Sequence, residues 1–315
     1  MLTRREYLKN SALAAAACAL PTSLLQAFES SKLMARAIPK TGEKLPIVGL
    51  GTSASFRQIA DQQDVSALRD VMQTMLDNGG TVLDTAPSYG AAEQVAGQIA
   101  RDAGMTDKIF WASKVNVAGR GGSRADERQA RAQLEQSFKY LGKNPIDLIQ
   151  VHNLGDLATQ MPLLQELKED GRIRYTGTTV TQTGRYAELE KAMRDHPLDF
   201  IGVDYALDNR TSAERVLPLA AELGIAVLVY VPFGRSSLFG RVSGMDVPVW
   251  AQEFGADTWG RFFIKYVAAH PAVTSVTPAT SKAKHMLDNM GAAYGELPDA
   301  ATRRKMEQLI DSLPG

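Results

Sequence analysis

Short apolar runs alternate with longer amphipathic stretches along most of the chain, and this pattern predicts its fold. Eight runs have the length and the Val, Ile, Leu and Thr content of buried strands: 47–52, 81–86, 109–114, 146–151, 173–178, 200–205, 226–231 and 273–278. Apolar residues recur at helical spacing at 64–80, 126–142, 157–171, 185–196 and 212–224. Strands that alternate with helices form parallel βαβ units. Eight such units predict a single-domain α/β protein, a (β/α)8 barrel of the TIM type.

The first 37 residues differ from the rest and resemble a bacterial twin-arginine export signal. Arg4 and Arg5 begin a positive region that ends at Lys9, and an alanine-rich apolar region follows at 11–25. That region is too short to form a membrane span. The small-x-small sequence at 35–37 matches a cleavage site, so we predict a signal peptide over residues 1–37. The twin-arginine translocation machinery would then carry the folded protein to the periplasm.

Two other interpretations remain for this region, an ordinary amphipathic helix and a lipoprotein anchor at Cys18. Because Cys18 is the only cysteine and lies in the predicted signal, the mature chain would have neither a disulfide nor thiol chemistry. Residues 38–315 would form the barrel, with a short hairpin over 38–46 that turns at Thr41-Gly42 before the first barrel strand.

The charge of the predicted mature chain excludes some classes of partner. Removing residues 1–37 takes away five basic and two acidic residues, which leaves 30 basic against 33 acidic and a net charge near −3. A slightly negative net charge does not favour binding to the phosphate backbone, so nucleic acid is not an expected partner. The sequence contains no metal-ligand spacing, no Gly-x-Ser-x-Gly and no phosphate-binding Gly-Lys-Ser/Thr motif, so no metal is predicted. A small molecule is the expected ligand.

Four polar residues follow consecutive predicted strands, where a barrel of this type has its active site. Asp84, Lys114 and His152 stand at or just after the ends of strands two, three and four, and Tyr89 lies in the loop after Asp84. Taken alone, each residue could have a purely structural role. Asp84 could cap a turn and Lys114 could be a surface lysine. His152 could be a core histidine, and Tyr89 could pack in an apolar wall. Together they suit protonation of a carbonyl oxygen, because an ammonium held by a carboxylate favours the ionised form of a nearby phenol, and an imidazole can orient the substrate oxygen. A nicotinamide cofactor would deliver the hydride.

Several motifs resemble the aldo-keto reductase family over essentially the whole predicted mature chain. They are VGLGT, LDTAPSYGAAE, ASKV, IDLIQVHN, GRIRYTG and TPATSKAKHMLDN, in this order. All four positions of the family's catalytic tetrad match Asp84, Tyr89, Lys114 and His152. The resemblance implies a (β/α)8 barrel, NADP(H) in preference to NAD(H), and reversible reduction of an aldehyde or ketone with Tyr89 as general acid and base. It also implies a monomer.

The resemblance further implies a path for the cofactor. Tyr230 matches the tyrosine that stacks on the nicotinamide ring. The loop with Phe233, Gly234, Ser236 and Leu238 would follow the pyrophosphate, and Thr280, Ser281, Lys282, His285 and Asn289 match the segment that holds the adenosine end.

Two positions depart from the family pattern at the nicotinamide amide group. The Ser-Asn pair common after strand five is Thr179-Val180 here, and the glutamine common in strand six is Gly202. Each lost side-chain contact would cost on the order of 1 kcal/mol. These departures leave two other functions open. One is non-redox proton transfer on a sugar or keto acid by the same tetrad. The other is an exported binding or accessory protein, which the cost of keeping a buried Asp-Lys pair argues against.

Aromatic and polar residues near the predicted barrel mouth are candidates for the substrate pocket. Phe56 and Trp111 are predicted to form its walls, although Trp111 in a strand could equally face the helices. The polar run at 208–210 is a further candidate.

Overall fold

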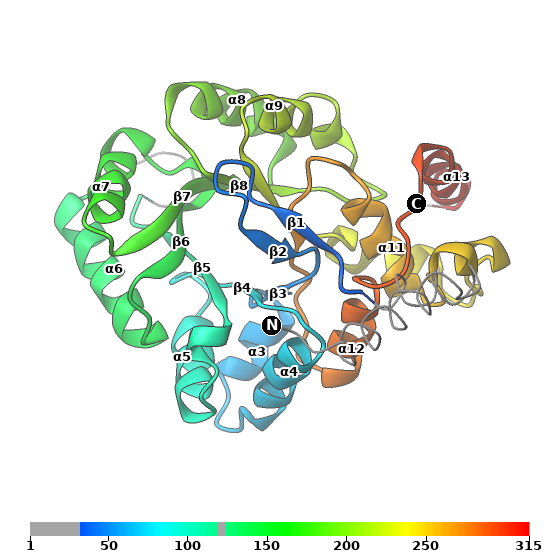
Figure 1. The fold of residues 1–315 in the computed structure, drawn as a ribbon, viewed down its shortest axis with the longest axis horizontal. Helices are drawn as coiled ribbons and strands as arrows, with labels where there is room; N and C mark the ends of the chain where they lie inside the picture. The colour runs from blue at the N-terminus through cyan, green and yellow to red at the C-terminus, as the bar shows by residue number, and fades with distance from the viewer. Residues whose placement is uncertain (1–31, 119–123, 315) are drawn as a thin grey trace, which may run out of the picture.

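The computed structural model describes residues 32–118 and 124–314, and these form a barrel of eight parallel strands (Figure 1). The strands are β3 (Leu50–Gly51), β4 (Val82–Asp84), β5 (Phe110–Val115), β6 (Ile146–Val151), β7 (Ile173–Val180), β8 (Phe200–Asp204), β9 (Ala226–Tyr230) and β10 (Ser275–Val276). Each pairs with the next strand in the chain. Parallel bridges between Val48 and Val276 and between Gly51 and Ala279 join the first strand to the last. The predicted (β/α)8 fold is confirmed.

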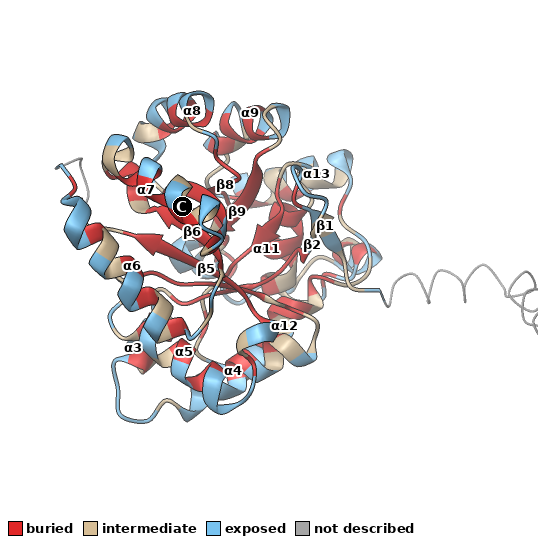
Figure 2. Cartoon of the chain, turned by 60° about the vertical axis from the view of Figure 1, so that its left-hand side comes forward, coloured by how far each residue is buried: buried red, intermediate tan, exposed pale blue. Residues whose placement is uncertain are grey.

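Helices cover the outside of the barrel. The five predicted helical stretches contain α4 (Ser66–Asp77), α6 (Glu127–Leu141), α7 (Leu157–Glu169), α8 (Tyr186–Asp195) and α9 (Val216–Glu222). Further helices are α3 (Ser55–Ala60), α5 (Ala92–Asp102), α10 (Ser237–Arg241), α11 (Trp259–Ala268), α12 (Ala283–Gly291) and α13 (Ala300–Asp311). Figure 2 shows buried strands inside and helices that bury one face and expose the other, which is the amphipathic pattern that predicts them. No helix in the described part of the chain is long and apolar enough to cross a membrane.

Alternation along the strands decides which side chains enter the barrel. An apolar layer fills the interior at the amino ends of the strands: Val82, Phe110, Ala112, Leu148, Tyr175, Phe200, Ala226 and Leu228. The inward positions that follow toward the carboxyl ends are Asp84, Lys114, Gln150, Gly202 and Tyr230. The barrel therefore has an apolar floor beneath a layer that, apart from Gly202, consists of polar side chains.

An N-terminal hairpin lies across the amino end of the barrel (Figure 1). Its strands β1 (Ala35–Ala37) and β2 (Lys44–Pro46) pair antiparallel, and Gly42 donates to the Ile38 carbonyl oxygen at 2.8 Å in the turn. Ile38 and Leu45 pack on the apolar floor. The hairpin is present at the predicted turn, but its first strand lies before Ile38.

Residues on the amino side of the boundary predicted after Ala37 also contact the barrel. Met34 donates its N–H to the Ala293 carbonyl oxygen at 2.8 Å, and Arg36 donates to the Val273 carbonyl oxygen at 2.6 Å. A cut after Ala37 would remove the whole of β1 and these bonds. The rest of the predicted signal, residues 1–31 with Arg4, Arg5 and Cys18, lies outside the described residues.

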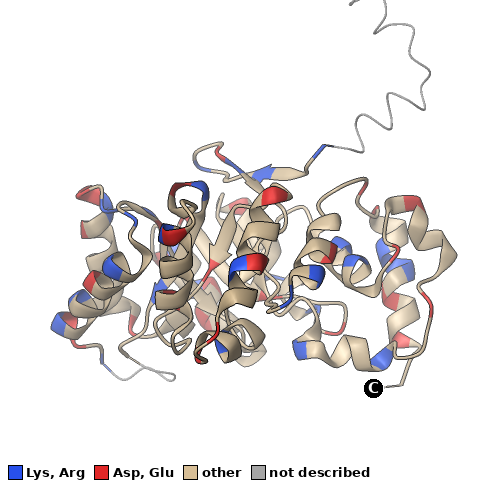
Figure 3. Cartoon of the chain, turned by 90° about the horizontal axis from the view of Figure 1, so that it is seen from below, with Lys and Arg blue, Asp and Glu red and all other residues tan. Residues whose placement is uncertain are grey.

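Charged side chains are spread over the outer helices. Figure 3 shows acidic and basic residues on the same visible helices.

Candidate active site

Asp84 and Lys114 form a buried ion pair inside the carboxyl end of the barrel. Asp84 ends β4, and Lys114 lies in β5 one inward position beyond Ala112, the register partner of Asp84. The Lys114 Nζ lies 2.7 Å from the Asp84 Oδ2 and also donates to the Thr85 carbonyl oxygen at 2.8 Å. Both side chains are buried. Removing either partner would leave an uncompensated charge in the interior.

The surroundings of this pair keep Lys114 charged. Burial by itself lowers the pKa of the Lys114 ammonium, but the Asp84 carboxylate and the Tyr89 phenol together raise that pKa above its ordinary value. Burial raises the pKa of Asp84, and the Lys114 ammonium and a hydrogen bond from Tyr230 act against this rise. Lys114 is therefore an ammonium at neutral pH. Its Nζ lies 5.1 Å from the ring centroid of Tyr89.

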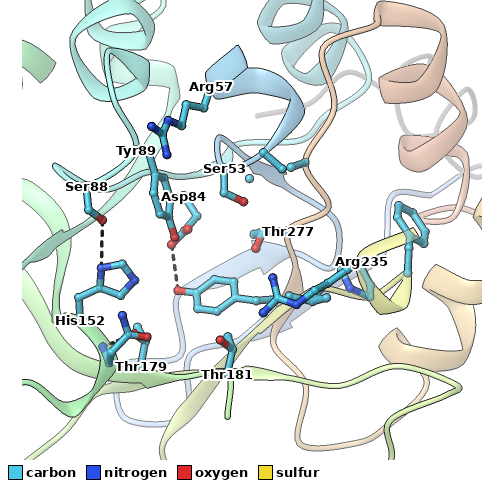
Figure 4. A pocket seen from close by; sticks show the side chains of 18 of the residues that line it. Ser53, Arg57, Asp84, Ser88, Tyr89, His152, Thr179, Thr181, Arg235 and Thr277 are labelled. Atoms are coloured by element: carbon cyan, nitrogen blue, oxygen red, sulfur yellow. Dashed lines mark hydrogen bonds between the residues drawn. The ribbon is translucent and has the colours of Figure 1, made fainter. Parts of the chain in front are cut away.

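Tyr89 and His152 line a pocket of about 570 Å³ above this pair (Figure 4). Tyr89 lies in the loop after β4, and His152 begins the short helix η2 (His152–Leu154) after β6. Their ring centroids are 5.9 Å apart at an interplanar angle of 82°. The His152 Nδ1 lies 3.3 Å from the Ser88 Oγ, a contact that orients the imidazole. The structure thus brings the four predicted catalytic residues together.

Tyr230 extends this network from the other side of the barrel. Its phenol donates to the Asp84 Oδ1 at 2.9 Å and accepts a hydrogen bond from the Gln150 Nε2 at 3.0 Å. Burial and the Asp84 carboxylate raise the pKa of Tyr230 well above its usual value, so Tyr230 stays a neutral donor. Gln150 is missing from the sequence prediction. It could have been found, because it pairs in register with Lys114 and alternation places it inside the barrel.

The position of Tyr230 also explains the glycine in β8. A Cβ at Gly202 would lie 2.3 Å from the Cε2 and 2.6 Å from the Oη of Tyr230, closer than nonbonded atoms can pack. A glutamine at this position and the Tyr230 ring in its observed place exclude each other. Packing therefore explains the departure from the family pattern at Gly202, because the Tyr230 ring occupies the space that a glutamine side chain would need.

Two polar residues line the pocket close to the ends of β6 and β7. The Thr179 Oγ1 accepts a hydrogen bond from the Asn153 N–H at 3.0 Å, and both residues line the pocket. Asn153 has a left-handed backbone with φ of 54°, a conformation that asparagine tolerates better than most residues. Val180, by contrast, is buried in the core. Asn153 is a second site residue that the sequence prediction missed, although it directly follows His152.

The loop after β9 forms the far end of the pocket. Phe233 and Ser236 line it as predicted, together with Arg235, which the prediction omitted. Gly234 instead lines a smaller neighbouring cavity with residues 208 and 209. Leu238 is fully buried in the hydrophobic core, so its side chain does not line the pocket, and a contact of this loop with a cofactor stays a prediction.

The predicted adenosine-binding segment surrounds the start of α12. The pocket wall ends at Thr277 and Ala279, so the segment follows the wall directly in the chain but does not line the pocket. Thr280 and Asn289 are buried, Ser281 is partly buried, and Lys282 and His285 are exposed. The Thr280 Oγ1 accepts the Lys282 N–H at 3.2 Å and so shapes the start of the helix. A role of this segment at a cofactor stays a prediction.

The two predicted aromatic walls need correction. Phe56 in α3 and Trp111 in β5 are fully buried in the core between the barrel and the helices. Trp111 faces outward because its neighbours at 110 and 112 face inward, and its Nε1 donates to the Thr106 carbonyl oxygen at 3.0 Å. In the polar run at 208–210, Arg210 pairs with Asp311 of α13 at 2.8 Å. Among the described residues, no cluster of His, Cys, Asp or Glu could hold a metal ion.

Comparison with known proteins places this architecture in a family. Residues 47–308 match the model of the aldo/keto reductase family. The aldo-keto reductase str7 of Strobilurus tenacellus is 26% identical over 278 residues, which cover 75% of this chain and 80% of that protein. The solved aldo-keto reductase AKR11C1 from Bacillus halodurans, in its holo form, superposes with a TM-score of 0.70 at 22% identity, covering 89% of this chain and 96% of that one.

A second solved structure supports the same fold. An aldo/keto reductase from Klebsiella pneumoniae, in complex with NADP and acetate, superposes with a TM-score of 0.69 at 23% identity, covering 87% of this chain and 94% of that one. The family match spans nearly all of the barrel and includes the four residues gathered at its carboxyl end. This chain belongs to the aldo/keto reductase family.

Proposed function

We propose that this chain is an NADP(H)-dependent oxidoreductase that reduces an aldehyde or ketone to an alcohol, or catalyses the reverse reaction. The observation that carries the proposal is the position of Tyr89 between the charged Lys114 and His152 at the wall of one pocket. The Lys114 ammonium stabilises the phenolate that remains when Tyr89 gives its proton to a carbonyl oxygen. His152 holds that oxygen by a hydrogen bond. In the reverse direction the Tyr89 phenolate accepts the alcohol proton.

The residues of the pocket fit a nicotinamide dinucleotide, which would supply the hydride when bound. The pocket runs from Tyr89 past Tyr230 to the loop with Arg235 and Ser236, whose guanidinium and hydroxyl suit a diphosphate. It ends next to the segment at 280–289. We assign Thr179 and Asn153 to the amide group of the nicotinamide, because both line the pocket near the end of β7 and a hydrogen bond joins them. NADP(H) is favoured over NAD(H), with Lys282 as a candidate partner of the 2′-phosphate.

The redox proposal is stronger than non-redox proton transfer. Non-redox chemistry was favoured by the departures at Thr179-Val180 and Gly202. Tyr230 accounts for Gly202 by occupying its space, and Asn153 offers a polar group that Val180 lacks. The departures therefore no longer count against a bound nicotinamide.

Titration of the purified protein, after removal of any dinucleotide already bound, with NADPH and NADH tests this proposal. One equivalent of NADPH is expected to bind, followed by its oxidation when benzaldehyde is added. Asn153→Ala is expected to weaken NADPH binding about fivefold, as loss of one hydrogen bond of about 1 kcal/mol predicts. Absence of binding for both nucleotides would refute the redox function and would leave proton transfer by the same tetrad as the alternative.

We further propose that the protein is exported folded by the twin-arginine route and acts in the periplasm with a cofactor bound before export. The order of Arg4, Arg5 and the apolar region supports export. Because Leu33 to Ala37 belong to the folded unit, we place the cleavage site before Leu33 rather than after Ala37.

Two measurements on protein from the periplasm test the cleavage site and the bound cofactor. The intact mass gives the first residue of the mature chain, and the filtrate of the denatured protein shows whether a cofactor was bound. The mature chain is expected to begin at or before Leu33, and a filtrate of the denatured protein is expected to contain near-stoichiometric NADP(H). Replacing Arg4 and Arg5 by lysine should keep the protein in the cytoplasm, since this route depends on the arginine pair. A mature chain that begins at Ile38 would contradict the placement of the cleavage site, and export of the Lys-Lys variant would contradict the route.

A further inference from the structure

We propose that the pocket selects carbonyl substrates that carry an anionic group, a carboxylate or a phosphate ester, and that Arg57 binds this group. The inference rests on the proposed function, since it names the substrate class for the same pocket.

Arg57 lies on the Tyr89 side of the pocket. It comes from α3 and lines the pocket with Ser53 and Ala54. Its Nε is 3.0 Å from the position that a Cβ on Gly90, the residue after Tyr89, would occupy. Figure 4 shows the Arg57 guanidinium on the same side of the pocket as Tyr89 and Ser53. A ligand with its carbonyl at Tyr89 can therefore direct another group toward Arg57.

Asp61 fixes both Arg57 and the loop after Tyr89. The Asp61 Oδ2 lies 3.4 Å from the Arg57 Nε, and its Oδ1 accepts the Ala91 N–H at 2.8 Å. A side chain at Gly90 would collide with this carboxylate, which explains a glycine there with φ of 57°. The contact with Asp61 uses the Nε, so the guanidinium keeps its two terminal nitrogens for a ligand. Planar donors of this kind bind carboxylates and phosphates through two hydrogen bonds.

The charges around the pocket favour an anion at this place. The Asp84 carboxylate in the pocket wall is compensated by Lys114 at 2.7 Å. The other cationic residue of the wall, Arg235, lies on the Tyr230 side in the loop that we assign to the cofactor diphosphate. Arg57 is thus the cation on the substrate side. Its partner Asp61 does not line the pocket and contacts the Nε, so a ligand in the pocket meets the guanidinium rather than this carboxylate.

Steady-state kinetics with two matched pairs of aldehydes test the inference. One pair is 4-carboxybenzaldehyde and benzaldehyde, and the other is glyceraldehyde 3-phosphate and glyceraldehyde. The wild type is expected to have a kcat/KM at least about tenfold higher for the charged member of one or both pairs, as a charge-assisted hydrogen bond implies. The pair that shows the preference tells whether the anion is a carboxylate or a phosphate.

Variants separate binding by Arg57 from general charge effects. Arg57→Gln should remove the preference, through a higher KM for the charged aldehydes. Arg57→Lys should keep part of the preference for the charged aldehydes, because lysine has the positive charge but lacks the planar guanidinium. Arg69→Gln, at an exposed position on α4 outside the pocket, makes the same change of net charge and should keep the full preference. Equal preference in wild type and Arg57→Gln would overturn the proposal.

A binding measurement distinguishes failure of this inference from failure of the proposed function. If the wild type reduces none of the four aldehydes with NADPH or NADH, the proposed function fails. Calorimetric titration with terephthalate, which cannot be reduced in this way, then decides on the anion site. At least tenfold weaker binding to Arg57→Gln supports the site, and equal or undetectable binding to both proteins overturns it.

Discussion

Replacing Tyr89 by phenylalanine is expected to lower kcat for carbonyl reduction about 100- to 10,000-fold, the usual contribution of a positioned general acid. The substitution removes the hydroxyl that we propose passes a proton to the carbonyl oxygen beside Lys114 and His152. It keeps the ring that packs edge-on against His152 at 5.9 Å. NADPH binding should therefore stay within about twofold of wild type, and the loss should appear in kcat.

The control for this variant is Tyr140→Phe, which removes a phenol from α6, outside the pocket. It should keep wild-type turnover. Full turnover by Tyr89→Phe would refute both the redox mechanism and the proton-transfer alternative, since both use this phenol. Loss of NADPH binding together with turnover would mean that Tyr89 contributes to the cofactor site rather than to proton transfer.

The barrel and the polar residues at the carboxyl ends of its strands could be predicted from the sequence, because both depend on local patterns. Apolar runs of strand length recur eight times, and a polar residue at the carboxyl end of a strand is visible against an apolar run, as with Asp84 in VLD and Lys114 in WASK. The same period of two that places Lys114 inside places Trp111 outside. This period decides between the two orientations predicted for Trp111 in favour of the one toward the helices.

Other parts of the site depend on contacts between distant segments, which a single sequence does not reveal. Gly202 is unexplained until the Tyr230 ring is seen to occupy its space, 28 positions later in the chain. Arg57 belongs to the pocket because α3 lies against the loop after Tyr89. The contacts of the residues before Ile38 are of the same kind. A small-x-small sequence is a local signal, whereas Ala35 to Ala37 pair with β2, Arg36 donates to the Val273 carbonyl oxygen, and Met34 donates to the Ala293 carbonyl oxygen.

Replacing Lys114 by methionine is expected to cost both activity and stability. Without the ammonium, the phenolate of Tyr89 is less favourable, so its pKa rises and alcohol oxidation, which needs the phenolate, should fall at least about 100-fold at neutral pH. The buried Asp84 carboxylate also loses its partner at 2.7 Å, which should destabilise the protein by about 3–5 kcal/mol. Denaturant unfolding and the rate of alcohol oxidation against pH measure the two effects.

The pH dependence of stability separates the charge of Asp84 from the loss of packing. Burial already raises the pKa of Asp84, and without Lys114 it should rise further. A carboxyl with a folded-state pKa above its unfolded value binds more protons when folded, so stability falls as the pH rises from about 4 through the folded-state pKa. The deficit of Lys114→Met should therefore be smallest in acid and largest near neutral pH. The double variant Asp84→Asn, Lys114→Met removes both charges and should regain most of the stability without regaining turnover. A double variant as unstable as Lys114→Met at neutral pH would show that the loss comes from packing around position 114 and not from an uncompensated carboxylate.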